Sequence, residues 1–475
     1  MSEGLPKGWV EVTLNDISDW SSGGTPKATE PKYYNGSIPW LIIADLNNST
    51  VKESAKKITQ QGLENSSAKW VEIGSILIAM YGSIGKLGIA GIRCTTNQAI
   101  AFTTNIWGNI PNMYLFFYLK YNEPELLNMG QGGAQKNISQ TILKKYPFLL
   151  PPLNEQKRIV AKLDAIMPRI DAVKERLDKV PGILKRFRQS VLTAAVTGRL
   201  TEQWREEHLE VESTDSFSEL PIGWKLKNIS DIALNKKGSI QSGPFGSQLL
   251  HSEFQESGIL AIGIDNVQDG YFTLGRQHRI SEKKYKELGK FTAKPLDVLI
   301  TVMATVGRCC VIPSNIEKSI ITKHVYRISC DQKIAFPFYI LLTLRGCKVV
   351  IDAIQDQIRG ATRPGINGAV IKKLIIPLPP LEEQKEIVQQ VDKLFALADK
   401  VEAHYQKAKA RVDKLSQSVL AKAFRGELVP QDPNDEPAEK LLERIVEEKA
   451  KMGAKLKGAR KSGVKKTVKK SEGGT

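Results

Sequence analysis

The 475-residue chain has few of the features that define secreted, metal-binding or membrane proteins. It has only five cysteines and five histidines, without a Cys-x-x-Cys pair or a metal-spaced histidine pair, which argues against a disulfide framework and a zinc site. Its apolar runs are short, and residues 75–80 are far from the roughly 20 residues of a membrane-spanning helix. No secretory signal is visible at the start of the sequence. We therefore expect a cytoplasmic chain with no membrane association and with cysteines buried as small apolar side chains.

Motifs for catalysis are also missing. An adenine methyltransferase needs a polar-Pro-Pro-aromatic loop, but both diprolines here are followed by leucine. Residues 82–86 resemble a phosphate-binding loop only faintly, because Leu87 stands where Ser or Thr is required. Residues 383–385 have the Glu-x-Lys of some nucleases, but we interpret them as a solvated helix start. The sequence thus predicts a chain that is not catalytic by itself and that holds no cofactor or metal.

What is present is an ordinary globular composition with an excess of positive charge. Hydrophobic residues make up 41% and charged residues 25% of the chain, and the formal net charge is +17. Residues 449–475 contain ten Lys or Arg and one acid, Glu472, so they carry +9 of this charge. This Gly/Ser/Lys-rich tail is predicted to be disordered. It could be a solubilising tail or an arm that seeks phosphate groups.

The chain repeats itself. LPPLNEQKRIV (150–160) recurs as LPPLEEQKEIV (378–388), and residues 150–200 match residues 378–428 at 20 of 51 positions without a gap. The preceding parts are related more loosely, through LPKGW (5–9) and LPIGW (220–224). The order is therefore a variable part, a near-repeated part, and then both again.

The near-repeated parts carry heptad seams, which predict helices that pack on one another. We expect one long helix in each copy, roughly 65 Å long, although Pro168 and the Pro181–Gly182 pair should kink or interrupt the first. Gly198 and Gly426 are natural helix stops. The variable parts mix short β-rich runs with apolar stretches at 112–121 and 337–344 that suit helices. The predicted fold class is α+β: two mixed α/β domains in tandem, linked by two long helices in an antiparallel coiled coil with pseudo-twofold symmetry.

These repeats, together with KRFRQSVLTAAVTGRLTEQW (185–204), QSVLAKAFRGELVPQDP (417–433) and GPFGSQL (243–249), make the chain resemble the DNA specificity (S) subunit of type I restriction–modification enzymes. The resemblance extends to about residue 430. It implies target-recognition domains that each read one half of an asymmetric, interrupted double-stranded DNA site. The implied parts are target-recognition domains at 1–152 and 220–380, coiled-coil helices at 153–203 and 381–428, a linker at 204–219, and an amphipathic helix with a basic tail at 429–475.

The resemblance also implies partners. Two modification (methyltransferase) subunits would bring S-adenosylmethionine and adenine methylation, and two restriction (motor-nuclease) subunits would bring ATP and Mg in the complete enzyme. The host would be a bacterium or an archaeon. The helix length would set the unread gap between the half-sites.

Base reading and phosphate binding require polar or cationic side chains on loops that reach a groove. Four Gly-containing loops qualify, at 81–86 and 132–137 in the first domain and at 305–308 and 359–363 in the second. Each could instead be an ordinary strand-connecting turn. The candidate DNA-binding residues are Ser83, Lys86, Gln135, Lys136, Asn137, Arg308, Lys323, Arg359, Thr362 and Arg363, with His324 as a weaker guess.

The ends of the helix repeats form the second candidate surface. Trp204, Phe424 and Arg425 could dock another subunit there, or could pack on the chain's own domains. Residues 437–452 form an amphipathic segment that could be a further docking helix. Two other functions stay open: a catalytic enzyme, which a methylation assay on the isolated chain would reveal, and a scaffold that binds protein, which would lack the steep salt dependence of DNA binding.

Overall fold

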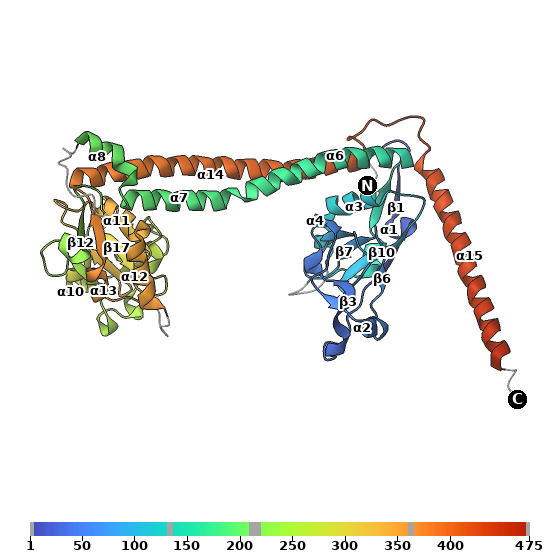
Figure 1. The fold of residues 1–475 in the computed structure, drawn as a ribbon, viewed down its shortest axis with the longest axis horizontal. Helices are drawn as coiled ribbons and strands as arrows, with labels where there is room; N and C mark the ends of the chain where they lie inside the picture. The colour runs from blue at the N-terminus through green and yellow to red at the C-terminus, as the bar shows by residue number, and fades with distance from the viewer. Residues whose placement is uncertain (1–3, 131–135, 209–219, 360–364, 472–475) are drawn as a thin grey trace. The chain divides into compact units, whose positions relative to one another are not determined.

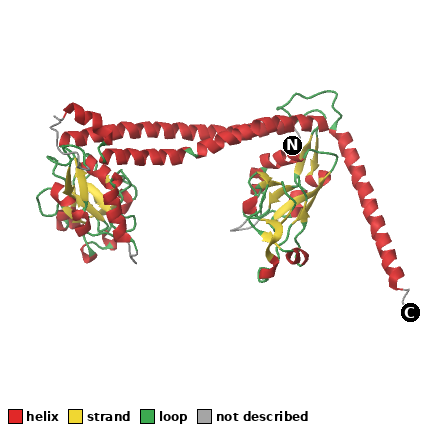
Figure 2. Ribbon diagram, in the orientation of Figure 1, coloured by secondary structure: helices red, strands yellow, loops and turns green. Residues whose placement is uncertain are grey.

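The computed structural model describes residues 4–130, 136–208, 220–359 and 365–471, with side chains described as far as Lys455 (Figure 1). The chain divides into two compact units. Unit 1 is built from two stretches of the sequence and unit 2 from one, and the helix at 381–424 contributes residues to both. Unit 1 comprises Met1–Leu177 and Ala408–Thr475, and unit 2 comprises Asp178–Lys407. Figure 2 shows strands gathered within each unit, with helices and loops around them.

Unit 1 contains three sheets, with strand orders β1-β11, β2-β10-β7-β8-β4 and β5-β3-β9-β6. Most neighbouring strands are antiparallel, but β3 and β9 are parallel, as are β4 and β8. The strands are β1 (Val10–Thr13), β2 (Ser18–Ser22), β3 (Tyr34–Leu41), β4 (Ser49–Val51), β5 (Lys57–Ile58), β6 (Trp70–Val71), β7 (Ile76–Ala79), β8 (Leu87–Ala90), β9 (Cys94–Thr96), β10 (Ile100–Ile106) and β11 (Pro147–Leu150).

Unit 2 repeats this plan, with strand orders β12-β21, β13-β20-β17-β18 and β15-β14-β19-β16. The parallel pair recurs as β14 and β19. The strands are β12 (Lys225–Asn228), β13 (Ile240–Ser242), β14 (Ile259–Ile262), β15 (His278–Ile280), β16 (Thr292–Ala293), β17 (Val298–Thr301), β18 (Cys309–Val311), β19 (Ser319–Ile321), β20 (Val325–Ile328) and β21 (Ile375–Leu378). The loose sequence similarity of the two variable parts thus reflects a shared topology.

Apolar helices follow the strands in both units, as the sequence predicts for 112–121 and 337–344. The helices of unit 1 are α1 (Leu14–Ile17), α2 (Gln60–Glu64), α3 (Asn112–Tyr121), α4 (Glu123–Asn128), α5 (Gln140–Lys144), α6 (Leu153–Asp178) and α15 (Ala438–Ser471). Those of unit 2 are α7 (Val180–Val196), α8 (Glu202–His208), α9 (Ile229–Ile232), α10 (Glu282–Glu287), α11 (Pro337–Gly346), α12 (Lys348–Ile358) and α13 (Gly368–Lys373). α14 (Leu381–Phe424) contributes residues to both units.

The long helices pair antiparallel within each unit. In unit 2, Arg188 of α7 binds Asp399 and Glu402 of α14, whereas Arg205, further along the chain, binds Glu383 near the start of α14. Because the partner numbers fall as the residue numbers rise, the two segments run in opposite directions. In unit 1, α6 and the second part of α14 contribute to the same apolar core. The predicted seam is therefore buried only in part, because Ile159, Leu163 and Ile170 lie in the core of unit 1 whereas Val173, Val401 and Leu415 are exposed.

The first copy does not form the single long helix that we expected. α6 ends at Asp178 and α7 begins at Val180, so the helix is interrupted at Lys179, whereas α14 runs unbroken for 44 residues. Pro181 explains the break, because its ring removes an N–H and clashes with the carbonyl four residues earlier. Pro168 is tolerated inside α6. The boundary between the units falls at the same place, after Leu177.

α15 corrects the prediction of a disordered tail. Its first turns pack on unit 1, where Ala438, Leu441 and Ile445 join the core, and its backbone remains helical to Ser471. A helix that is already nucleated by packing extends easily through Lys, Ala and Arg, which are good helix formers. The five cysteines are buried and unpaired, as predicted. Within the described part of the chain, the search for a helix of membrane-spanning length and apolarity found none.

Candidate nucleic-acid interface

In unit 1, the predicted loop 81–86 folds into a tight turn between β7 and β8. The Ala79 N–H donates to the Lys86 carbonyl over 2.9 Å, and the Gly85 N–H donates to the Ala79 carbonyl over 3.0 Å. Gly82 and Gly85 have φ angles of 67° and 83°, in the left-handed region that glycine enters at no steric cost. The turn therefore holds the exposed Ser83 at its tip.

The loop between β17 and β18 of unit 2 repeats this turn bond for bond. The Thr301 N–H donates to the Arg308 carbonyl over 2.8 Å, and the Gly307 N–H donates to the Thr301 carbonyl over 2.9 Å. Ala304 takes the position of Gly82 with a φ of 61°, a conformation that costs a non-glycine residue roughly 1–2 kcal/mol. The same turn is thus kept even where one of its residues is strained, which marks it as a functional candidate.

The second predicted loop of unit 1 joins the first. The Ile138 N–H donates to the Met80 carbonyl over 3.0 Å, and Tyr81 forms an isolated β-bridge with Asn137. These contacts fix the end of loop 132–137 beside the tight turn. The two loops, far apart in the sequence, therefore form one edge of unit 1.

Unit 2 makes the equivalent connection. The Ile366 N–H donates to the Val302 carbonyl over 3.1 Å, and Met303 forms an isolated β-bridge with Gly365. Of the predicted loop 359–363 only Arg359 is described, but Gly365, shortly after it, lies at the tight turn of unit 2. The bridge to the tight turn therefore recurs in both units, and we call the two surfaces the loop edges.

A third segment reaches the loop edge of unit 2, and none of its residues was among the predicted DNA-binding residues. Ser242, the last residue of β13, and Ile300 of β17 are both paired with Tyr326 of β20, so β13 ends at the same edge as β17. The segment 243–250 follows directly. Its Phe245 is 59% exposed, which is unusual for a large aromatic side chain. The signal in the sequence was the glycine-flanked GPFGSQL motif.

The candidate residues of unit 1 differ in how free they are. Ser83, Lys136 and Asn137 are exposed at the loop edge. Lys86 is half-buried, and its ammonium donates to the Ile43 carbonyl over 3.3 Å, so part of its hydrogen-bonding capacity is used internally. Gln135 lies outside the described residues.

Arg308 is exposed at the loop edge of unit 2, and its guanidinium donates to Gln268 over 3.4 Å. Gln268 and the neighbouring Tyr271, which is 62% exposed, are therefore part of the same surface. Neither was predicted, because nothing in the local sequence separates them from an ordinary turn. A cation, an amide and an aromatic ring together can contact phosphate, base edge and base face.

Lys323 and His324 form the turn before β20. Lys323 is exposed, and the His324 carbonyl accepts from the Val302 N–H over 3.0 Å, so this turn supports the tight turn. Burial and, secondarily, the nearby Lys323 charge lower the pKa of His324. The imidazole is therefore neutral at pH 7, and its buried Nδ1 has no hydrogen-bond partner in the described structure.

Arg359, at the end of α12, is exposed and lies 3.4 Å from Asp356. An exposed ion pair of this kind contributes little to stability, so its guanidinium can exchange Asp356 for another anion at small cost. Thr362 and Arg363 lie outside the described residues. The candidates that the described structure brings to the loop edge of unit 2 are therefore Arg308 and Lys323.

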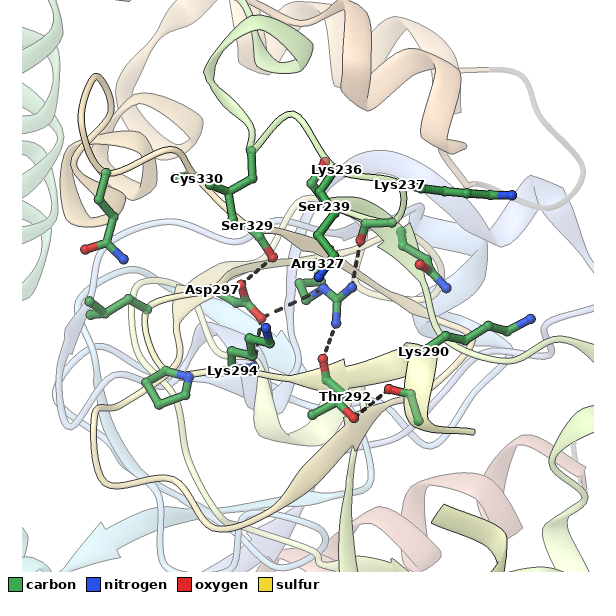
Figure 3. Close-up of a pocket in the computed structure, with 17 residues that line it drawn as sticks. Lys236, Lys237, Ser239, Lys290, Thr292, Lys294, Asp297, Arg327, Ser329 and Cys330 are labelled. Carbon is green, nitrogen blue, oxygen red and sulfur yellow. Dashed lines mark hydrogen bonds and ion pairs between the residues drawn. The ribbon is translucent and has the colours of Figure 1, made fainter. Parts of the chain in front are cut away.

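A hollow of about 640 Å³ opens in unit 2 where β17 begins and β20 ends (Figure 3). Arg327 lies inside it and donates to the carbonyls of Gly238 and Thr292, and its Nε is 3.8 Å from Asp297. Burial lowers the pKa of Arg327 and raises that of Asp297. Since the tight turn follows the other end of β17, this hollow lies at the opposite edge of the sheet. Arg327 links β20 there to β16 of the second sheet and to the turn before β13.

The repeated sequence motifs meet in a buried joint between each domain and its helix. In unit 1, the Trp9 indole N–H donates to the Glu155 carboxylate over 3.0 Å. In unit 2, the Trp224 indole N–H donates to Glu383 over 2.9 Å, and Glu383 has no exposed surface. The interpretation of residues 383–385 as a solvated helix start is therefore wrong at Glu383. The LPxGW and LPPLxEQK motifs recur because together they build this joint.

Of the three residues predicted to dock another subunit, two lie at the surface and one lies in the core. Trp204 is half-buried and stacks on His208, with ring centroids 4.4 Å apart. Arg425 is exposed and pairs with Glu427 over 2.9 Å. Phe424 is only 2% exposed, because its ring packs among the tyrosines of α3 in the core of unit 1. The prediction that Phe424 could dock another subunit is therefore wrong, and it packs on its own domain instead.

Two domains of one plan, each with the same loop edge and each joined to a long helix by the same Trp–Glu bond, define a tandem recognition protein. The model of the type I restriction modification DNA specificity domain matches residues 6–181 and 221–409, so the match covers both domains. The chain belongs to this family, the specificity subunits of type I restriction–modification systems.

Curated relatives and solved structures agree with this assignment. The EcoBI specificity subunit of Escherichia coli is 29% identical over 89% of this chain and 87% of its own length. The MjaVIII specificity subunit of Methanocaldococcus jannaschii is 24% identical over 86% of this chain and 92% of its own length. A chain solved in work on complex assembly of the type I R-M system superposes with a TM-score of 0.67 at 20% identity, over 90% of this chain and 100% of its own. The HsdS subunit of Thermoanaerobacter tengcongensis has a TM-score of 0.50 at 20% identity, over the same shares.

Proposed function

We propose that this chain is the DNA-reading subunit of its complex, and that each domain recognises one half of a bipartite, asymmetric site. The observation that carries the proposal is the loop edge, which occurs in both units with the same hydrogen bonds. Each edge presents exposed polar or cationic side chains on a backbone that glycine lets approach phosphate closely. Such surfaces suit the combination of base and phosphate contacts that sequence-specific binding requires.

The two half-sites should differ. At matching positions of the tight turn, unit 1 has Ser83 and Lys86, whereas unit 2 has Thr305 and Arg308. Unit 2 also presents Phe245 in the loop that follows β13. Arginine binds guanine through two parallel hydrogen bonds, which a lysine cannot reproduce in the same geometry. Different side chains on one scaffold therefore favour different base sequences.

The second part of the proposal concerns the paired long helices. The length of the paired helices sets the unread spacer, and the outer helix ends, with Trp204 and Arg425, contact two methyltransferase subunits. Those subunits hold S-adenosylmethionine, and two motor-nuclease subunits with ATP and Mg complete the restriction enzyme. Chemistry resides in these partners, and the complex works in the cytoplasm. The family membership of the chain and the surface position of Arg425 support this assignment.

Methylation-sensitive sequencing tests the reading function directly. A genome that expresses this chain with its modification subunit should carry methylated adenines in a two-part motif with a fixed gap. Exchanging residues 10–150 for the corresponding part of another family member should change one half of the motif only. If both halves changed, or if no motif appeared, the assignment of one half-site to each domain would be refuted.

The spacer idea has a separate test. Removing one helical turn, about 5.4 Å, from α14 together with the facing turn of its partner helix should alter the gap and leave both half-sites unchanged. Removing the same number of residues from a solvent-exposed surface loop is the matched control and should leave the gap as it was. Altered half-site letters with an unaltered gap would contradict the ruler role of the helices.

Two measurements separate the remaining alternatives. A scaffold that binds only protein would show no steep loss of DNA affinity with salt, whereas a DNA-binding subunit should lose affinity through counterion release. A solitary methyltransferase would transfer methyl groups to DNA without a partner. We expect salt-sensitive DNA binding by the complex and no methyl transfer by the isolated chain.

A further inference from the structure

The C-terminal helix α15 is fixed to unit 1 by its first turns. Before the helix begins, Asp435 forms an ion pair with Arg158 of α6 over 2.6 Å. Leu441 and Ile445, one turn apart, are then buried in the core of unit 1. The acidic partner and the apolar stripe together determine where the helix starts and which face it buries.

Polar contacts continue this anchor by one further turn. Glu448 accepts from the Gly108 N–H over 3.2 Å, and the Lys449 ammonium donates to the Asn15 carbonyl over 2.6 Å. Burial lowers the pKa of Lys449, as expected for an ammonium held against the protein surface beside Trp107. The contacts that hold α15 to unit 1 thus extend from Asp435 to Lys449.

The charge of α15 changes sign where the anchor ends. Residues 438–448 contain four glutamates against Lys440 and Arg444, which gives 2 − 4 = −2. Residues 449–471 contain ten Lys or Arg and no acid, which gives +10. Lys451 and Lys455, the first cations past the anchor, are exposed. The family match ends at residue 409, so α15 lies outside the part of the chain that the match covers.

Repulsion between lysines destabilises the basic part of the helix, and binding to a polyanion would relieve this repulsion. Lysines repeat at i and i+4 in pairs such as 461/465 and 465/469, and each like-charge pair destabilises a helix by roughly 0.2–0.5 kcal/mol. Apolar residues are sparse after the anchor, with Met452, Leu456, Val464 and Val468 only, so there is no broad apolar face for insertion into lipid. The composition suits a regular array of phosphates in water.

We infer that the basic part of α15 binds the sugar-phosphate backbone of duplex DNA outside the recognised half-site, without regard to sequence. The inference rests on the proposed DNA-reading function, but it concerns affinity rather than the choice of bases. Residues 449–471 span roughly 35 Å as a helix, which corresponds to about ten base pairs at 3.4 Å each. Its contribution is to hold the complex on DNA while the loop edges test the sequence.

The size of the effect follows from counterion release. A chain that ends at Met452 keeps the anchor and lacks eight of the cations. If about half of them face the duplex, about four phosphate contacts are lost, and the slope of log affinity against log salt should become less steep by about 3.6. The affinity advantage of the full chain over the truncated chain should therefore shrink by about 100-fold between 50 and 200 mM salt.

The experiment uses the full chain assembled with its modification subunit, and compares it with the complex of the chain truncated after Met452. Affinity is measured from 50 to 200 mM salt on two duplexes, one with the methylated motif and one without it. A second, full-length variant replaces the seven lysines between 455 and 470 with glutamine, and a third replaces the same lysines with arginine. We expect the truncated and glutamine variants to lose affinity for both duplexes equally, and the arginine variant to match the parent.

The outcomes separate this inference from the proposed function. If the parent complex does not discriminate between the duplexes, the proposed reading function fails, whatever the tail does. If it discriminates, and truncation leaves the salt slope unchanged, the inference about α15 is overturned. It is also overturned if the glutamine variant loses affinity for anionic phosphatidylserine vesicles but not for DNA, because the partner would then be a membrane surface.

Discussion

The joint between each domain and its helix makes a sharp prediction about one carboxylate. In unit 2, Glu383 accepts from Arg205 over 2.6 Å, from Thr201 over 2.7 Å and from Trp224 over 2.9 Å. The first two donors share Oε1, and the indole uses Oε2. In Glu383→Gln only one of these positions can remain an oxygen, so the amide nitrogen must face a donor.

The expected cost of Glu383→Gln combines two terms. Hydrogen bonds to a charged group contribute about 1.5–3 kcal/mol, and a buried donor left without an acceptor costs about 1–3 kcal/mol. Since Arg205 would also lose its only neutralising charge in the joint, we expect a loss of about 3 kcal/mol in the local stability of unit 2. That corresponds to roughly a 100-fold faster hydrogen exchange of the protected amides around β12.

Glu155→Gln in unit 1 is the matched control. The Glu155 carboxylate accepts from Trp9 at one oxygen, whereas its other oxygen is buried without a hydrogen-bond partner in the described structure. The charge of Arg158 acts on it, but Arg158 forms its ion pair with Asp435 instead. Burial raises the pKa of Glu155, so its charged form destabilises the fold as the pH rises from 4.5 towards the raised value. Glutamine removes that charge and can still accept from the indole.

Hydrogen exchange followed by mass spectrometry reads both units of the intact chain at once. At pH 7, Glu155→Gln should leave the protection of β1 unchanged or slightly increased, whereas Glu383→Gln should lower the protection of β12 strongly. Equal effects of the two substitutions would refute the reasoning, because it predicts opposite consequences from the same chemical change.

Three further predictions concern the loop edge. Arg308→Ala should cost roughly 1–3 kcal/mol and relax one base position if the guanidinium reads a base, and methylation-sensitive sequencing would show an unchanged motif if it does not. Positions 304 and 82 both have left-handed backbone conformations, which glycine adopts more easily than alanine. In urea unfolding, Ala304→Gly should therefore stabilise unit 2 by up to about 1 kcal/mol, and Gly82→Ala should destabilise unit 1 by a similar amount. A loss of stability in Ala304→Gly would contradict the idea that Ala304 is strained. Because the pKa of His324 is lowered, the unfolded chain binds its proton more tightly and unit 2 should lose stability as the pH falls below 6.5; His324→Gln should flatten that part of the pH profile, and an unaltered profile would remove His324 as its source.

The sequence predicted the architecture well because the repeat is strong where the fold is constrained. The heptad seams, the helix stops at Gly198 and Gly426, and the apolar helices α3 and α11 all appear in the structure. Prediction failed where tertiary packing decided the outcome. Phe424 looked like an amphipathic helix end, but its ring fills the core of unit 1.

The candidate site was predictable in its loops but not in all its side chains. The glycines located the predicted loops at 81–86 and 305–308, and the structure shows that the first of them meets Asn137 of the second predicted loop of unit 1. Gln268 and Tyr271 were missed, because they reach Arg308 only through the packing of β18 against the loop after β14. Such proximity between distant segments has no local signature in one sequence.

The pairing of the first and last strands of each domain has a consequence for how this protein can change. β1 lies antiparallel to β11, and β12 to β21, so the first and last strands of each domain are neighbours. An insert that ends in the same two strands can replace a whole domain without disturbing the helices or the joint. If each domain reads one half-site, as we propose, a new specificity can arise by exchange of a complete module through recombination, in one genetic event instead of by gradual substitution.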